Sequence, residues 1–149
     1  MAKRQRLIQA GPAAIWDVLS DAERYAEWVV GTRRVTRADA DWPNEGARME
    51  YTLGVGPLTF HDTCVVRICE RPRRLELEAL ARPFGSARIA IELIPWGADC
   101  VVVVDEHPLR GLGARLHGPP AEAAIHLRNR RMLANLAREA ENRRADHTT

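Results

Sequence analysis

Long apolar runs, paired cysteines and lysines are scarce or absent in this 149-residue chain. No apolar stretch reaches the roughly 18 residues of a membrane-spanning helix, and the polar start, Met1–Arg6, lacks the apolar segment of a signal peptide. Cys64, Cys69 and Cys100 form no CxxC pair, and an odd number of cysteines argues against a disulfide framework. We therefore expect a soluble, cytoplasmic protein with free thiols and no stable membrane insertion.

The charge is nearly balanced. Lys3 is the single lysine among 22 basic residues, and 20 acidic residues reduce the net charge to +2. Because carboxylates are interspersed among the arginines, the chain lacks the concentrated basic face of a nucleic-acid binder. A hydrophobic content of 46% over this length predicts one domain, residues 1–149, as a monomer or a homodimer.

Motifs for common catalytic chemistry are also missing. The segment Gly54-Val55-Gly56 is not followed by the third glycine of a phosphate-binding loop, so it predicts a hairpin turn. The five histidines stand at no recognised metal-ligand spacing, and neither Ser20 nor Ser86 lies in a GxSxG elbow. We expect no metal and no cofactor.

The longest amphipathic segment runs from Pro119 to Arg143. Two prolines suit the first turn of a helix, and neither glycine nor proline interrupts the segment afterwards. One stripe of this helix is apolar and holds Ala121, Ile125, Met132, Leu133, Leu136 and Ala140. Asn129 lies in the middle of the stripe, where it is either a satisfied core amide or a ligand contact.

The preceding chain changes from helical to strand periodicity. A short strand at Arg6–Ala10 is followed by a helix that begins at Pro12 and a second short helix from Ala22, on which Tyr25 and Trp28 project the same way. From residue 29 onward the period is two, and turn signals at 41–46, 54–57, 70–73, 82–85 and 95–99 separate six strands. This order predicts an α+β fold in two layers, an antiparallel sheet covered by the long helix.

Alternation identifies the inner face of that sheet. The residues expected there are Met49, Tyr51, Leu53, Leu58, Phe60, Cys64, Val66, Ile68, Leu75, Leu77, Ala79, Ile89, Ile91 and Leu93. The intervening positions are mostly charged and belong outside. Cys100 to Val104 is apolar on both sides, so its orientation is open: one choice turns Asp105 and His107 inward, the other Glu106.

Several segments are similar to one known superfamily. They are Pro12–Asp21 followed by Tyr25 and Trp28, Trp42-Pro43, Gly56-Pro57-Leu58 and Arg128-Asn129-Arg130. With the element order, they resemble the SRPBCC superfamily (START, Bet v 1 and polyketide cyclase-like proteins), in particular its small bacterial polyketide cyclase/dehydrase-type members. The resemblance implies a helix-grip fold, in which a curved sheet of about seven strands surrounds the C-terminal helix and leaves an apolar cavity.

Asp62 is the polar exception on the inner face. If it points inward, it can bind a ligand hydroxyl or act as a general base; a bulge can instead turn it outward, or an arginine or backbone amides can hold it. Asp62, Tyr51 and His107 are the candidates for proton transfer. The residues expected to contact a ligand are Trp28, Tyr51, Leu53, Phe60, Asp62, Leu77, Ile89, Ile91, Leu109, Ile125, Asn129 and Met132.

Three functions follow from these observations and the resemblance. The first is binding or carriage of a small hydrophobic ligand, polycyclic, aromatic or lipid-like, behind a gate formed by Pro108–Gly118. The second is a cyclase or aromatase-like enzyme, which would need a proton-transfer group about 3 Å from the reacting atom. The third is a co-chaperone-like interaction domain, which requires an exposed apolar patch that the charged outer faces argue against.

Overall fold

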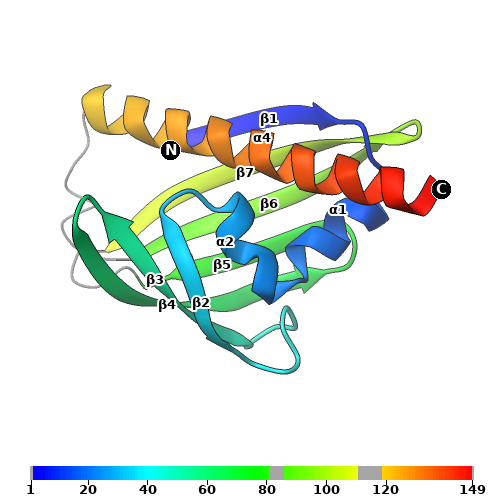
Figure 1. Cartoon of the computed structure of the whole chain (residues 1–149). Coiled ribbons are helices and arrows are strands. Elements are labelled where there is room, and N and C mark those ends of the chain that lie inside the picture. The colour runs from blue at the N-terminus through cyan, green and yellow to red at the C-terminus, as the bar shows by residue number, and fades with distance from the viewer. Residues whose placement is uncertain (1, 81–85, 111–118, 149) are drawn as a thin grey trace.

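The computed structural model describes residues 2–80, 86–110 and 119–148 (Figure 1). Its elements are β1 (Ala2–Ile8), α1 (Pro12–Leu19), the 3-10 helix η1 (Ala22–Arg24), α2 (Tyr25–Trp28), β2 (Thr32–Ala38), β3 (Arg48–Val55), β4 (Leu58–Glu70), β5 (Arg74–Ala79), β6 (Ser86–Trp96), β7 (Asp99–Arg110) and α4 (Pro119–Thr148). None of the helices within these ranges is both long and apolar enough to cross a membrane.

The seven strands form one antiparallel sheet in the order β1-β7-β6-β5-β4-β3-β2. The prediction of an α+β helix-grip fold is confirmed. Strands β2 to β7 form a meander, and β1 joins its far edge by pairing with β7. All the helices lie on one side of the curved sheet, where α4 packs along β1 and α1 while α2 packs on β2 (Figure 1).

The core lies between this concave face and the helices, as the alternation predicts. Met49, Leu77 and Ile91 are at most 1% exposed on the inner face. The buried apolar side chains among the described residues of α4 are Met132, Leu133, Leu136, Ala137 and Ala140, which follow the helical repeat. Leu127, on the opposite side of α4, is 54% exposed. One apolar stripe therefore attaches the helix to the rest of the molecule.

The sequence predictions for β4 are wrong at its two ends. The pairing with β5 shifts register between Val66 and Ile68, so that Ile68 pairs with the outward-facing Glu76. This bulge moves Ile68 off the inner face and places Cys69 against the core instead. Leu58, at the other end, is 58% exposed beside the turn that connects β3 to β4.

Element boundaries differ at both ends of the chain. The first strand covers Ala2–Ile8 rather than Arg6–Ala10, because seven of its residues pair with β7. The last helix begins at Pro119 as predicted and continues to Thr148. Of the expected gate, 108–110 belong to strand β7 and 111–118 lie outside the described residues.

Candidate functional site

A polar pair lies on the otherwise apolar inner face. Tyr51 of β3 and Asp62 of β4 are direct cross-strand partners, so their side chains project from the same side of the sheet. The Tyr51 hydroxyl donates a hydrogen bond of 2.8 Å to Asp62 Oδ2, and the backbone N–H of Thr63 donates one of 2.8 Å to Oδ1. Tyr51 is 3% exposed and Asp62 is 7% exposed. Asp62 thus points inward, held partly by a backbone amide.

Helix α2 extends this pair. Tyr25 packs on Tyr51 with ring centroids 5.4 Å apart, and Trp28 packs edge-on against Tyr25 at the same centroid distance. Tyr25 and Trp28 are three residues apart on one helix, which places both rings toward the sheet. The result is a buried row of aromatic rings that ends at the Asp62 carboxylate.

Burial keeps the proton on the acidic groups around Asp62. It raises the pKa of Tyr25 and of Tyr51 well above the ordinary phenol value, with the neighbouring thiol, carboxylate and phenol adding to the effect. It also raises the pKa of the Cys64 thiol to about 12, with a further contribution from Asp62. These groups are therefore hydrogen-bond donors near neutral pH, and Cys64 is no thiolate nucleophile.

The middle of α4 contributes a second polar group. Asn129 is 0% exposed, and neither atom of its side-chain amide has a hydrogen-bond partner among the described residues. The described residues therefore do not satisfy this amide, and leaving it unpaired costs roughly 1–3 kcal/mol. Trp28 Nε1 and Thr32 Oγ1 are likewise buried without a partner in the described parts of the chain.

Arg128, the residue next to Asn129, joins three elements. Its Nη1 lies 3.2 Å from Glu106 Oε1 of β7, and its Nε donates a hydrogen bond of 3.3 Å to the carbonyl oxygen of Val30, after α2. The Glu106 side chain is 12% exposed. This bridge secures the part of α4 that carries Asn129 against the sheet and against the α2–β2 connection.

The position of Glu106 decides the orientation of β7. Val102, Val104 and Glu106 face inward, since the two valines are at most 2% exposed. His107 therefore lies on the outer face, where its Nε2 is 3.1 Å from Asp105 Oδ2. The hypothesis that His107 transfers a proton in the interior is wrong, because alternation along the strand turns it away.

The residues predicted to contact a ligand are buried to different extents. The buried ones are Leu77, Ile89, Ile91, Met132 and Trp28, whereas Leu53 and Phe60 are half-buried near the turn of the β3–β4 hairpin. Leu109 and Ile125 lie in β7 and α4, at positions whose side chains are not among those described. Sequence reasoning left Glu106 open as one of two alternatives for the last strand and did not assign Tyr25 or Arg128 to the site, although the three-residue spacing of Tyr25 and Trp28 indicated a shared direction.

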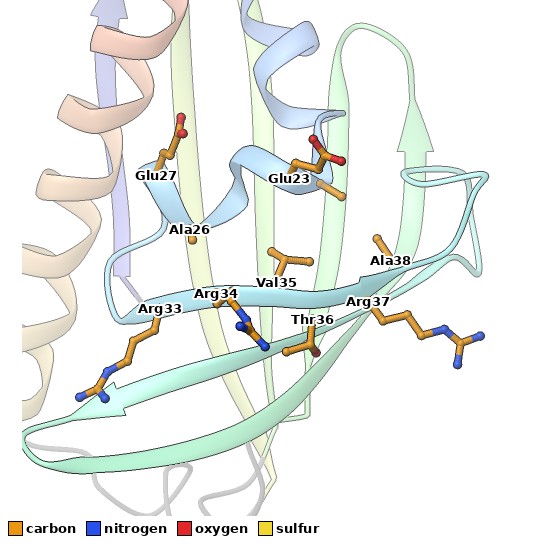
Figure 2. Close-up of a pocket in the computed structure, with 10 residues that line it drawn as sticks. Glu23, Ala26, Glu27, Arg33, Arg34, Val35, Thr36, Arg37 and Ala38 are labelled. Atoms are coloured by element: carbon orange, nitrogen blue, oxygen red, sulfur yellow. The ribbon is translucent and has the colours of Figure 1, made fainter.

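Two concave regions adjoin these elements. A pocket of about 270 Å³ is lined by Arg48, His61, Asp62, Thr63 and Leu80, and it opens where β4 extends past the last residue pair with β5. A groove of about 520 Å³ lies between β2 and the η1–α2 segment; Figure 2 shows Val35 and Ala38 turned toward that segment, and Arg33 and Arg37 turned away. Asp62 is one of the residues that line the first pocket.

The described residues were also compared with the ligand sets of metal sites. Within residues 2–80, 86–110 and 119–148, no three histidine, cysteine, aspartate or glutamate side chains cluster as ligands of one metal ion. The buried polar groups described above are hydroxyl, amide, indole and carboxylate groups within an apolar core, and such groups can orient a bound molecule by hydrogen bonds.

One protein family matches nearly the whole length of the chain. A family described as "Polyketide cyclase / dehydrase and lipid transport" matches residues 2–141. No curated protein matches the chain.

Solved structures share the fold at low sequence identity. A protein from Nitrosomonas europaea is 16% identical with a TM-score of 0.76, over 96% of this chain and 95% of that one. Ara h 8.0201 is 7% identical with a TM-score of 0.70, over 94% and 96%. A protein of the dynemicin biosynthetic locus is 17% identical with a TM-score of 0.67, over 94% of this chain and 46% of that one.

Proposed function

The chain belongs to the polyketide cyclase/dehydrase and lipid transport family, and from this premise we propose that it binds a small hydrophobic, ring-bearing ligand between the sheet and α4. The ligand is bound or carried rather than converted. The observation that supports this proposal best is the buried Tyr51–Asp62 pair, with a hydrogen bond of 2.8 Å, on a face whose neighbouring residues are apolar.

The unpaired polar groups of the core favour a ligand that carries oxygen atoms. The Asn129 amide and the Trp28 indole N–H are buried without partners among the described residues, so they retain hydrogen-bonding capacity that a ligand oxygen can use. Asp62 can accept a hydrogen bond from a ligand hydroxyl. A plain hydrocarbon chain would leave these groups unpaired, whereas a hydroxylated ring compound would satisfy them.

The protonation states of the site reduce the number of candidates for a general base. Tyr25, Tyr51 and Cys64 keep their protons near neutral pH, because burial raises the pKa of each. A general base must lose a proton before it can accept one from a substrate. Asp62 is then the remaining candidate of the original three, since His107 lies on the outer face.

The alternative is a cyclase or aromatase-like enzyme in which Asp62 is the base. It is favoured by the family description and by the similar protein of the dynemicin biosynthetic locus. The two functions differ in what an Asp62→Asn variant does. A binder loses affinity for a hydroxylated ligand, whereas an enzyme loses turnover at saturating substrate while binding changes little.

Native mass spectrometry of gently purified protein tests the proposal directly. We expect a fraction of molecules to carry a retained organic compound, released when the protein is unfolded in organic solvent. A titration with 2-naphthol, a hydroxylated ring, should in addition quench the fluorescence of the buried tryptophans in a saturable manner. Protein that carries nothing and shows no saturable 2-naphthol binding would contradict the proposed function.

A further inference from the structure

An apolar patch lies on the outer face of the sheet, on the side away from the helices. The pairing register aligns Leu7 of β1, Val101 of β7 and Ile94 of β6 in one row across three strands. Leu7 is 49% exposed and Ile94 is 39% exposed, and two residues further along β6 Trp96 is 65% exposed. Val103 lies on the same face one row further along β7, but it is only 8% exposed.

This patch contradicts the expectation that the charged outer faces carry no exposed apolar patch. Elsewhere on the outer face, arginine and glutamate side chains form ion pairs, as Arg67 does with Glu78 and Arg88 with Glu76. On β7, by contrast, apolar residues occupy both faces between Cys100 and Val104. A strand that is apolar on both faces is typical of a sheet covered on both sides. In the described structure, helices pack on the inner side alone.

We infer that this patch, formed by Leu7, Ile94, Trp96 and Val101, is the interface between two copies of the chain. A sheet face is regular and nearly flat, so it can pack on an identical face about 10 Å away. Dimers with two-fold symmetry use the same surface on both subunits, and such dimers are the commonest soluble oligomers. This inference is independent of the proposed ligand site, which lies on the other face.

The row formed by Leu7, Val101 and Ile94 can pack on the same row of a second copy. A two-fold axis parallel to β7, between the two sheets, exchanges β1 with β6 and places β7 on β7. Leu7 then packs on the partner subunit's Ile94, and Val101 packs on the partner's Val101. In the next row the Gln5 amide faces the carboxylate of the partner's Glu92, because Gln5, Val103 and Glu92 are aligned. An amide donor opposite a carboxylate is a favourable pairing at the rim.

The patch is small, which determines the expected affinity. The exposed parts of Leu7, Ile94 and Trp96 amount to on the order of 300 Å² per copy, whereas a standard interface buries about 800 Å² per partner. The apolar row is therefore the centre of an interface whose rim is polar. We expect a dissociation constant in the micromolar range, with monomers at nanomolar concentration.

Sedimentation velocity over a concentration series measures this equilibrium. We expect wild-type protein to shift from monomer to dimer, and Ile94→Lys to weaken the dimer at least tenfold, since a lysine would be buried against the partner's Leu7. Leu127→Lys is the matched control, because Leu127 is similarly exposed on α4, outside the patch. A wild-type protein that stays monomeric at millimolar concentration, or an equal effect of both substitutions, overturns the inference.

A charge exchange tests the arrangement of the two copies. Gln5→Glu should weaken the dimer about tenfold by facing the partner's Glu92, and adding Glu92→Gln should restore it. Trp96 supplies a second signal because the other three tryptophans, Trp16, Trp28 and Trp42, are buried. Its emission should shift to shorter wavelength as the dimer forms, and Trp96→Phe should abolish that shift. A double variant no better than Gln5→Glu alone would overturn the proposed pairing.

Discussion

Asp62 and Glu76 are buried carboxylates on opposite faces of the same sheet, with 7% and 6% of their surfaces exposed. On the inner face, Asp62 accepts hydrogen bonds from the Tyr51 hydroxyl and from a backbone amide, both neutral donors. On the outer face, Glu76 lies 2.6 Å from Arg74 and 2.7 Å from Arg88. Two arginines satisfy the outer carboxylate, whereas the Tyr51 hydroxyl and a backbone amide are among the groups that bind the inner one.

The difference separates a structural group from a binding group. Burial by itself would raise the pKa of Glu76, but the hydrogen bonds from Arg74 and Arg88 lower it below the ordinary value. Glu76 therefore joins its own strand, β5, to β6 through Arg88. The Asp62–Tyr51 pair has instead a pocket beside it and unpaired polar atoms elsewhere in the core, so a ligand can join its hydrogen bonds. Four experiments test this comparison.

The largest effect should come from the apolar contact that covers the inner face. Leu136→Ala should lower the free energy of unfolding by roughly 2–4 kcal/mol, because the Leu136 side chain is 1% exposed on the side of α4 that faces the core. Leu127→Ala is the control, and its cost should stay below about 0.5 kcal/mol. Urea titrations of both variants measure the difference. Equal losses would mean that the other side of α4 faces the core.

Alkali should destabilise the inner face selectively. Tyr25 and Tyr51 are the chain's two tyrosines, and burial raises the pKa of both. Their contribution is complete below the unfolded pKa of about 10 and is lost as the pH rises, by about 3 kcal/mol in total at pH 11. Absorbance at 295 nm should show no tyrosinate until the protein unfolds. Tyrosinate that forms near pH 10 in folded protein would show that the rings are accessible.

A ligand pair with and without a hydroxyl tests the role of Asp62. Asp62→Asn keeps the shape of the side chain but removes its charge, so it should weaken 2-naphthol binding about tenfold, near 1.4 kcal/mol. Binding of naphthalene, which has no hydroxyl, should change little. Fluorescence titrations measure both affinities. Equal weakening for the two probes would indicate a structural role, and unchanged affinity for both would place Asp62 outside the site.

Acid should affect the outer face more weakly. Because the pKa of Glu76 is lowered in the folded state, its stabilisation is present above the unfolded pKa of about 4.3 and is lost as the pH falls through the folded value. Glu76→Gln should cost about 1 kcal/mol at neutral pH, since its arginine partners are partly exposed, and should flatten the acid limb of the stability profile. Glu78→Gln, which removes the more exposed pairing with Arg67, should change the profile less. If the acid limb of the Glu76→Gln profile were unchanged, Glu76 would not contribute to the loss of stability at low pH.

The local sequence pattern was sufficient to predict much of the fold and some of the residues of the candidate site. The two-residue period placed Met49, Tyr51 and Asp62 on one face of the sheet. The helical period placed Asn129 and Leu136 on the side of α4 that faces the core. These predictions rest on side-chain direction within a single element, which alternation or helical repeat determines. The similarity of a few segments to a known superfamily added the helix-grip arrangement, which the structure confirms.

The failures share a physical cause. The bulge that displaces Ile68 is a property of the pairing between β4 and β5, and the inward turn of Glu106 depends on which face of an all-apolar strand meets the core. Neither leaves a mark in the periodicity of one strand. The same reason hid the outer patch, because Leu7, Ile94 and Val101 come from three strands that only the register aligns.

What the sequence determined by itself is the set of elements and their apolar faces, since propensity, turn residues and periodicity act over a few neighbouring residues. Tertiary structure alone decided the partners. Tyr51 meets Asp62 because β3 and β4 pair in one register, Arg128 meets Glu106 because α4 crosses β7, and Glu76 meets Arg88 across β5 and β6. Hydrogen bonds and ion pairs need atoms within a few ångströms, and only the folded chain brings residues distant in sequence so close.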